Sequence, residues 1–166
     1  MEVDPQIHVS SGPTDGSEAA VRDAEAIALR IAADEAAADA ERARLDGEPL
    51  RPVEPGPEIV PYLAASEVVL TSASATLLAD SPRGEGIVPA GRGRLLLTSL
   101  RLVHASESGV RSFSLGDVAE VGVVGDRQML VAADDGRELR LDVAEPRVFR
   151  VRIAYAVAAD RRMRER

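Results

Sequence analysis

The second half of the chain alternates apolar and polar residues with the two-residue period of β-strands. Seven short apolar segments follow Pro61, and turn signals such as Gly125-Asp-Arg127 and Asp135-Gly136 separate the later ones. Residues 139–143 alternate leucine or valine with charged side chains, which is typical of a strand with one buried face. The pattern predicts strands over residues 72–77, 94–98, 100–105, 110–115, 118–124, 128–133 and 139–143.

A helical pattern follows the last of these strands. Pro146 suits the first position of a helix, where no backbone N–H is needed. Four apolar residues after it share one helical face: Phe149, Ile153, Ala156 and Val157. We expect a helix from Pro146 to about Arg162 that closes one open end of a β-barrel.

The N-terminal part predicts a separate acidic, Ala-rich helix over residues 17–46, because this stretch contains neither Gly nor Pro. Its apolar residues recur near a seven-residue spacing: Ala20, Ala24, Ile27, Ile31, Ala38 and Leu45. Asp34 and Glu41 interrupt that stripe. Three arrangements fit so thin a stripe: a solvated helix, a dimer or partner-docking helix, and a helix packed on the barrel. The sequence favours the first.

Composition divides the rest of the chain. Residues 1–16 are rich in Pro, Gly, Ser and acidic groups and predict a disordered tail. Residues 47–58 hold four prolines within one short stretch, which predicts an extended linker. The folded domain is then expected over residues 59–166.

The net charge of −8 belongs to the N-terminal part. Residues 1–58 carry fourteen acidic side chains against five Arg, whereas residues 59–166 carry fourteen against fifteen. An acidic segment repels phosphate backbones, and two Tyr, two Phe and no Trp leave little for base stacking, so nucleic acid is excluded as a partner.

The chain contains no Cys, which removes disulfides and thiolate chemistry and favours a cytoplasmic location. No apolar run approaches the roughly 18 residues of a membrane span, so we expect no transmembrane segment. All twenty basic residues are Arg, a bias that GC-rich bacterial genomes produce.

Two motifs carry a resemblance to a known family. The phrase Gly93-Arg-Leu-Leu-Leu-Thr98-Ser-Leu-Arg101-Leu-Val-His104, followed by Phe113-Ser-Leu115-Gly-Asp117-Val118, resembles the GRAM and bacterial PH-like domains over roughly residues 59–160. The resemblance implies a mainly β, PH-like fold: a seven-stranded, partly open barrel of two near-orthogonal antiparallel sheets with a C-terminal capping helix. Such domains bind lipid head groups, peptides or other domains.

The same resemblance makes the connection between the first two strands a candidate ligand loop. Residues 79–94 contain Arg83, Arg92 and Arg94, whose guanidinium groups suit phosphate, although Asp80 and Glu85 offset two of these charges. We expect no metal site, cofactor or catalytic residue. His104 stands alone in the folded part, and the adjacent pair Asp134-Asp135 is explained by a turn.

These observations predict a non-enzymatic interaction or scaffolding module. Its expected partner is a protein or a second copy of the chain, reached through the N-terminal helix, a strand edge of the barrel, or both. The alternative is peripheral binding of anionic membrane lipid through Arg83, Arg92 and Arg94. The near-neutral charge of the folded part favours the protein partner.

Overall fold

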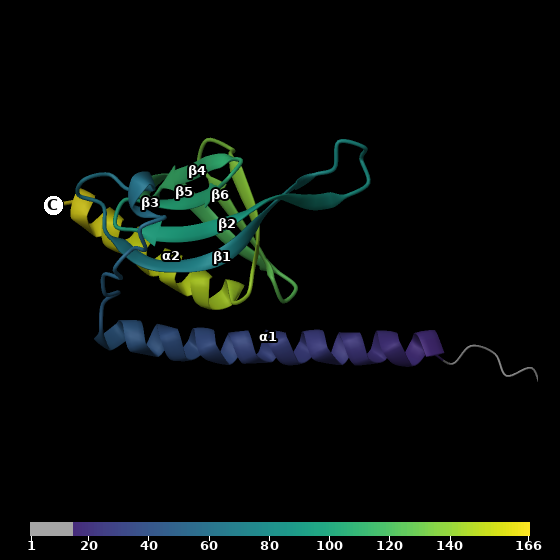
Figure 1. Ribbon diagram of the computed structural model, residues 1–166. Coiled ribbons are helices and arrows are strands. Elements are labelled where there is room, and N and C mark those ends of the chain that lie inside the picture. Colours follow the sequence, from purple (N-terminus) through teal and green to yellow (C-terminus); the bar gives the residue numbers. More distant parts are fainter. Residues whose placement is uncertain (1–14) are drawn as a thin grey trace, which may run out of the picture.

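The computed structural model describes residues 15–166, so residues 1–14 of the predicted tail lie outside the described residues, whereas Asp15 and Gly16 belong to the first helix. Both long helices lie on the same side of a curled sheet (Figure 1). The elements, in chain order, are α1 (Asp15–Gly47), the 3-10 turn η1 (Val60–Tyr62), β1 (Val69–Asp80), β2 (Ile87–Thr98), β3 (Arg101–Ser106), β4 (Gly109–Ser114), the 3-10 turn η2 (Leu115–Asp117), β5 (Val118–Val124), β6 (Gln128–Ala133), β7 (Glu138–Val143) and α2 (Pro146–Arg164).

The seven strands form one antiparallel sheet in the order β4-β3-β2-β1-β7-β6-β5. Strands β1 to β4 pair in chain order, as do β5 to β7, and β1 pairs with β7 to join the two sets. The two ends of this order, β4 and β5, are sheet edges, so the barrel is partly open. The predicted fold class, a mainly β, partly open barrel of seven antiparallel strands with a C-terminal helix, is confirmed, and its strands belong to one continuous curled sheet where two sheets were expected.

The core fills the inside of the curled sheet and is closed by α2. Apolar side chains from every strand meet there, with Leu95, Leu97, Leu102, Val131 and Leu141 fully buried. The helix contributes the face predicted from the sequence, namely Phe149, Ile153, Ala156 and Val157.

The connection predicted as a loop over residues 79–94 is instead a long hairpin, so that prediction is wrong. Strands β1 and β2 continue their pairing to Asp80 and Ile87 and project beyond the barrel (Figure 1). Pro89 lies at a register shift, where a strand tolerates proline. A Cβ on Gly93 would lie 2.1 Å from the carbonyl oxygen of Ala105, so glycine is required by close backbone approach. The residues that indicated a loop are therefore compatible with this strand.

A second, smaller core covers the outer face of the sheet. Ile59 and Leu63, on either side of η1, pack over Val69, Leu96 and Val103. Residues 64–68 connect this covering segment to β1, and a polar network holds the segment in place.

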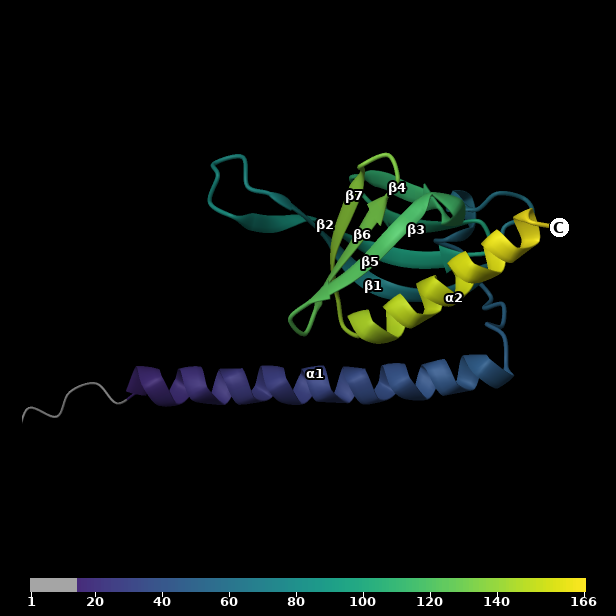
Figure 2. The same ribbon diagram turned by 180° about the vertical axis from the view of Figure 1, so that it is seen from behind.

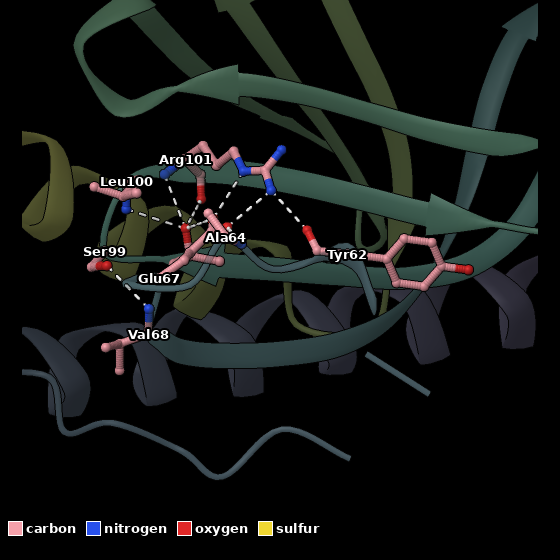
Figure 3. A network of polar contacts seen from close by, with 8 residues as sticks. Tyr62, Ala64, Glu67, Val68, Ser99, Leu100 and Arg101 are labelled. Atoms are coloured by element: carbon pink, nitrogen blue, oxygen red, sulfur yellow. Dashed lines mark hydrogen bonds and ion pairs between the residues drawn. The ribbon is translucent and has the colours of Figure 1, made fainter. Parts of the chain in front are cut away.

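Glu67 is the centre of that network (Figure 3). Its buried carboxylate accepts hydrogen bonds from Arg101 Nε and Nη2 at 2.9 Å each, from Thr98 Oγ1 at 2.6 Å and from the Ala64 N–H at 2.9 Å. Arg101 also donates to the carbonyl of Tyr62 at 2.7 Å. Burial alone would raise the pKa of Glu67, but these hydrogen bonds together lower it to about 2. Thr98 and Arg101, which belong to the motif at residues 93–104, thus have a structural role.

Candidate functional site

The C-terminal half of α1 packs along α2, and the two helices lie side by side in both views (Figures 1 and 2). One face of α1 is buried in this contact, and it consists of Asp34, Ala38, Glu41 and Leu45. Of the three arrangements open from the sequence, this half of the helix therefore adopts the packed one.

Asp34 supplies the N-terminal cap of α2. Its carboxylate accepts hydrogen bonds from the backbone N–H of Arg147 at 2.9 Å and of Val148 at 3.4 Å. Glu145, at the cap position of α2 itself, makes no such bond. An acidic side chain on one helix thus satisfies the first amides of another and interacts with the positive end of its dipole.

Glu41 makes the second polar contact of this interface. It accepts hydrogen bonds from Arg44 on its own helix, at 2.9 Å, and from Arg152 Nε on α2, at 2.8 Å. Arg152 Nη1 also donates to Thr71 Oγ1 on β1, at 2.9 Å. The Arg44 hydrogen bonds, opposed by burial and aided by Arg152, lower the pKa of Glu41 to about 2. The two acidic residues that interrupted the apolar stripe are the anchors of the docked helix.

A groove of about 730 Å³ runs along the outer face of α2. The start of β5 forms one wall and the last turns of α1 form the other, because α2 lies between them (Figure 2). The lining residues are Arg42, Leu45, Asp46, Val118, Ala119, Glu120, Val121, Arg150, Val151, Ile153, Ala154, Tyr155, Val157, Ala158, Arg161, Arg162 and Glu165.

The floor of the groove is apolar and its rim is charged. Ala154 and Ala158 are exposed on the floor, above the buried Ile153 and Val157. The rim carries four arginines and three acids: Arg42, Arg150, Arg161, Arg162, Asp46, Glu120 and Glu165. Such a surface can bury apolar side chains and pair an anionic group with arginine.

Strand β5 is an edge strand beside this groove. One side pairs with β6, and the other faces no strand within residues 15–166. Arg161 Nη2 donates to the carbonyl of Val118 at 3.3 Å, at the start of the strand. An edge with unpaired backbone groups is a template for a further strand.

The three arginines predicted as a ligand site do not form one cluster. Arg92 and Arg94 are two residues apart on β2, and Arg94 donates to Ser72 Oγ at 2.8 Å and Ser74 Oγ at 3.4 Å. Arg83 lies at the tip of the hairpin, beyond the last pair Asp80 and Ile87. Since strands rise about 3.3 Å per residue, roughly 20 Å or more of hairpin separates Arg83 from Arg94.

The other polar residues considered from the sequence have structural partners. His104 is buried, with Nε2 3.4 Å from the Ala75 carbonyl oxygen, and burial together with the nearby Arg111 lowers its pKa. Asp135 accepts the Arg137 N–H within its turn, at 3.0 Å. In the part of the chain that the structure describes, no group of acidic or histidine side chains is arranged to hold a metal ion, and no helix is long and apolar enough to cross a membrane.

Comparisons with known proteins concern the fold alone. No protein-family model and no curated protein matches the chain. A Ran-binding domain from the nuclear complex component Nup2 of Ashbya gossypii is 20% identical over 56% of this chain and 97% of its own, with a TM-score of 0.44. The C-terminal domain of an unknown protein from Leishmania infantum is 17% identical over 51% and 77%, with a TM-score of 0.40. Similarity at this level carries no information about ligands.

Proposed function

We propose that this protein is a non-enzymatic interaction module that binds an extended segment of a partner protein in the groove along α2. The observation that carries the proposal is the groove's position beside the free edge of β5. A bound segment adds a strand to that edge through its backbone, and its alternate side chains enter the groove.

The groove specifies the chemistry of the segment. Small residues on the floor, such as Ala154 and Ala158, leave room for medium-sized apolar side chains. Neither Arg150 nor Arg162 takes part in an ion pair among residues 15–166, so these arginines are available to an acidic residue of the partner. The partner segment therefore combines apolar residues two apart with a flanking Asp or Glu.

We further propose that the domain is related to the GRAM and bacterial PH-like domains and that the protein is located in the cytoplasm. Support for these two statements comes from the quoted motif and the absence of cysteine from the chain. Lipid binding through the β1–β2 hairpin has weaker support, because the hairpin separates Arg83 from Arg92 and Arg94.

Selection from a random peptide library with the full chain as bait tests the proposal. We expect selected peptides to carry the acidic and apolar pattern and to bind the full chain in fluorescence titrations. Ala154→Glu places a negative charge in the groove, which repels the acidic residue of the peptide and disfavours its apolar side chains. It is expected to weaken that binding roughly tenfold or more. Ala36→Glu makes the same change on an exposed face of α1 and is expected to leave it unchanged.

Two outcomes contradict the proposal. One is a selection without a shared pattern, and the other is equal weakening by Ala154→Glu and Ala36→Glu. Vesicles of neutral and of anionic lipid, sedimented with the same proteins, test the alternative. Binding to the anionic vesicles alone, weakened by salt and lost in Arg92→Ala, would support the hairpin in place of the groove.

A further inference from the structure

The face of α1 that docks on α2 belongs to a longer seam. Residues recur along the helix at alternating spacings of four and three, the pattern of a coiled-coil interface. The seam consists of Ala20, Ala24, Ile27, Ile31, Asp34, Ala38, Glu41 and Leu45. It is therefore continuous over most of the helix, although the apolar residues alone show it only in part.

Only the second half of this seam has a partner in the fold. Asp34 caps the first turn of α2, so α2 begins beside that residue and runs toward Leu45. Residues 15–33 extend past the start of α2, and both views show this part of α1 projecting from the barrel (Figures 1 and 2). At 1.5 Å per residue, this overhang is roughly 28 Å long.

Apolar side chains on the overhang are exposed. The exposed fraction is 39% for Ile27 and 53% for Val21, and Ala20 and Ala24 are exposed as well. Because the same seam packs against a helix from Asp34 onward, continuity of the interface indicates a helix as its missing partner.

We propose that the overhang pairs with the overhang of a second copy, antiparallel, to form a two-fold symmetric dimer. In the register that brings the two seams together, Ala24 faces the partner's Ile27 and, by symmetry, Ile27 faces the partner's Ala24. Ala20 in the same way faces the partner's Ile31. Every layer then combines a large residue with a small one, which packs two helices closely.

The positions beside the seam also match in this register. Asp23 faces the partner's Arg30 and, by symmetry, Arg30 faces the partner's Asp23, so two ion pairs form across the dimer. Arg30 bonds Asp126 through Nε alone, at 2.7 Å, and leaves its other nitrogens for a second acceptor. On the opposite side, Val21 lies beside the partner's Ala28. This interface is independent of the groove on α2.

Sedimentation equilibrium of the full chain tests the dimer, with a matched pair of variants. Ile27→Asp puts a charge into the seam and is expected to raise the dissociation constant roughly tenfold or more. Leu29→Asp makes a like change at a side chain that is 72% exposed and off the seam, so the dimer is expected to persist. Circular dichroism checks that both variants are folded, and peptide binding in the groove is expected to be unaffected by either.

A monomer at about 100 µM full chain would overturn the proposal. So would a dimer that survives Ile27→Asp, or one that both variants abolish. Because the chain has no Cys, disulfides report the orientation. Mixed Ala24→Cys and Ile27→Cys proteins are expected to cross-link with each other, whereas self-cross-linking of Ile27→Cys alone would indicate a parallel pair and contradict the proposed register.

Discussion

At the scale of single residues, charged side chains in this protein are fixed by several partners at once. Glu67 is fully buried as a side chain and accepts four hydrogen bonds, and Asp34 caps a helix far away in sequence. Local sequence patterns do not show such partners. Three of the four hydrogen bonds to Glu67 come from residues 31 and 34 positions away, and those to Asp34 come from residues 113 and 114 positions away.

Glu67 should make the stability of the fold depend on pH. Because its pKa is lowered to about 2 in the folded protein, its stabilisation is present above the ordinary value near 4.5 and is lost as pH falls toward 2. The lowered pKa of Glu67 corresponds to a contribution of about 3 kcal/mol to the free energy of unfolding. Glu67→Gln is therefore expected to lower the free energy of unfolding in urea at pH 7 by about that amount, with a difference from the parent that shrinks below pH 4.5.

Glu107→Gln is the control for that experiment, because Glu107 is exposed in the turn between β3 and β4. It should leave the unfolding free energy within about 0.5 kcal/mol of the parent at every pH. A constant gap between Glu67→Gln and the parent from pH 7 to pH 2 would show that the carboxylate charge is not what holds the segment.

Two glycines in strands should differ in how strongly substitution by alanine destabilises the protein. Gly93→Ala forces a Cβ to within 2.1 Å of the Ala105 carbonyl oxygen, so the β2–β3 pairing has to open. In Gly122→Ala, on β5, the added atom meets only Leu130 Cβ at 4.0 Å. We expect a loss of about 2 kcal/mol or more for Gly93→Ala in thermal unfolding and no loss for Gly122→Ala. Equal melting temperatures would contradict the required close approach.

At the scale of elements, the apolar segments predicted all seven strands and the helical spacing after Pro146 predicted α2, because each element buries one face on the common core. The hairpin over residues 79–94 was missed, since Pro89 and Gly93 are suited to loops and only their strand neighbours show why they are tolerated. The docking of α1 was one of three arrangements left open, and the sequence favoured a solvated helix instead. The helix that starts at Pro146 lacks a capping side chain of its own, and Asp34 supplies it from another helix. The sequence shows each residue separately, and only the fold shows that they are in contact.

Removing the cap should weaken α2 and its contact with α1 together. Asp34→Ala leaves the N–H groups of Arg147 and Val148 without their acceptor, and an N-cap contributes about 1 kcal/mol. We expect faster amide hydrogen exchange at both residues and along residues 34–47. Asp39→Ala, on the exposed face of the same helix, is the matched control and should change neither. Faster exchange at Arg147 and Val148 without any change in α1 would mean that Asp34 does not hold the two helices together.

At the scale of the whole molecule, the proposed binding surface is a product of the fold. The groove takes its floor from α2 and its walls from β5 and α1, so its residues are spread from Arg42 to Glu165. The sequence could indicate a module with a free strand edge, but it could not indicate which edge has an apolar surface beside it. The candidate site was therefore placed on the hairpin arginines, which the fold holds apart.

The most direct test of strand addition is amide hydrogen exchange of the full chain, with and without a peptide selected for the acidic and apolar pattern. The account predicts slower exchange within residues 118–124 of β5 and along the exposed face of α2, with no change at the other sheet edge, β4. Protection confined to β4 or to the β1–β2 hairpin, with β5 exchanging as in the free protein, would contradict it.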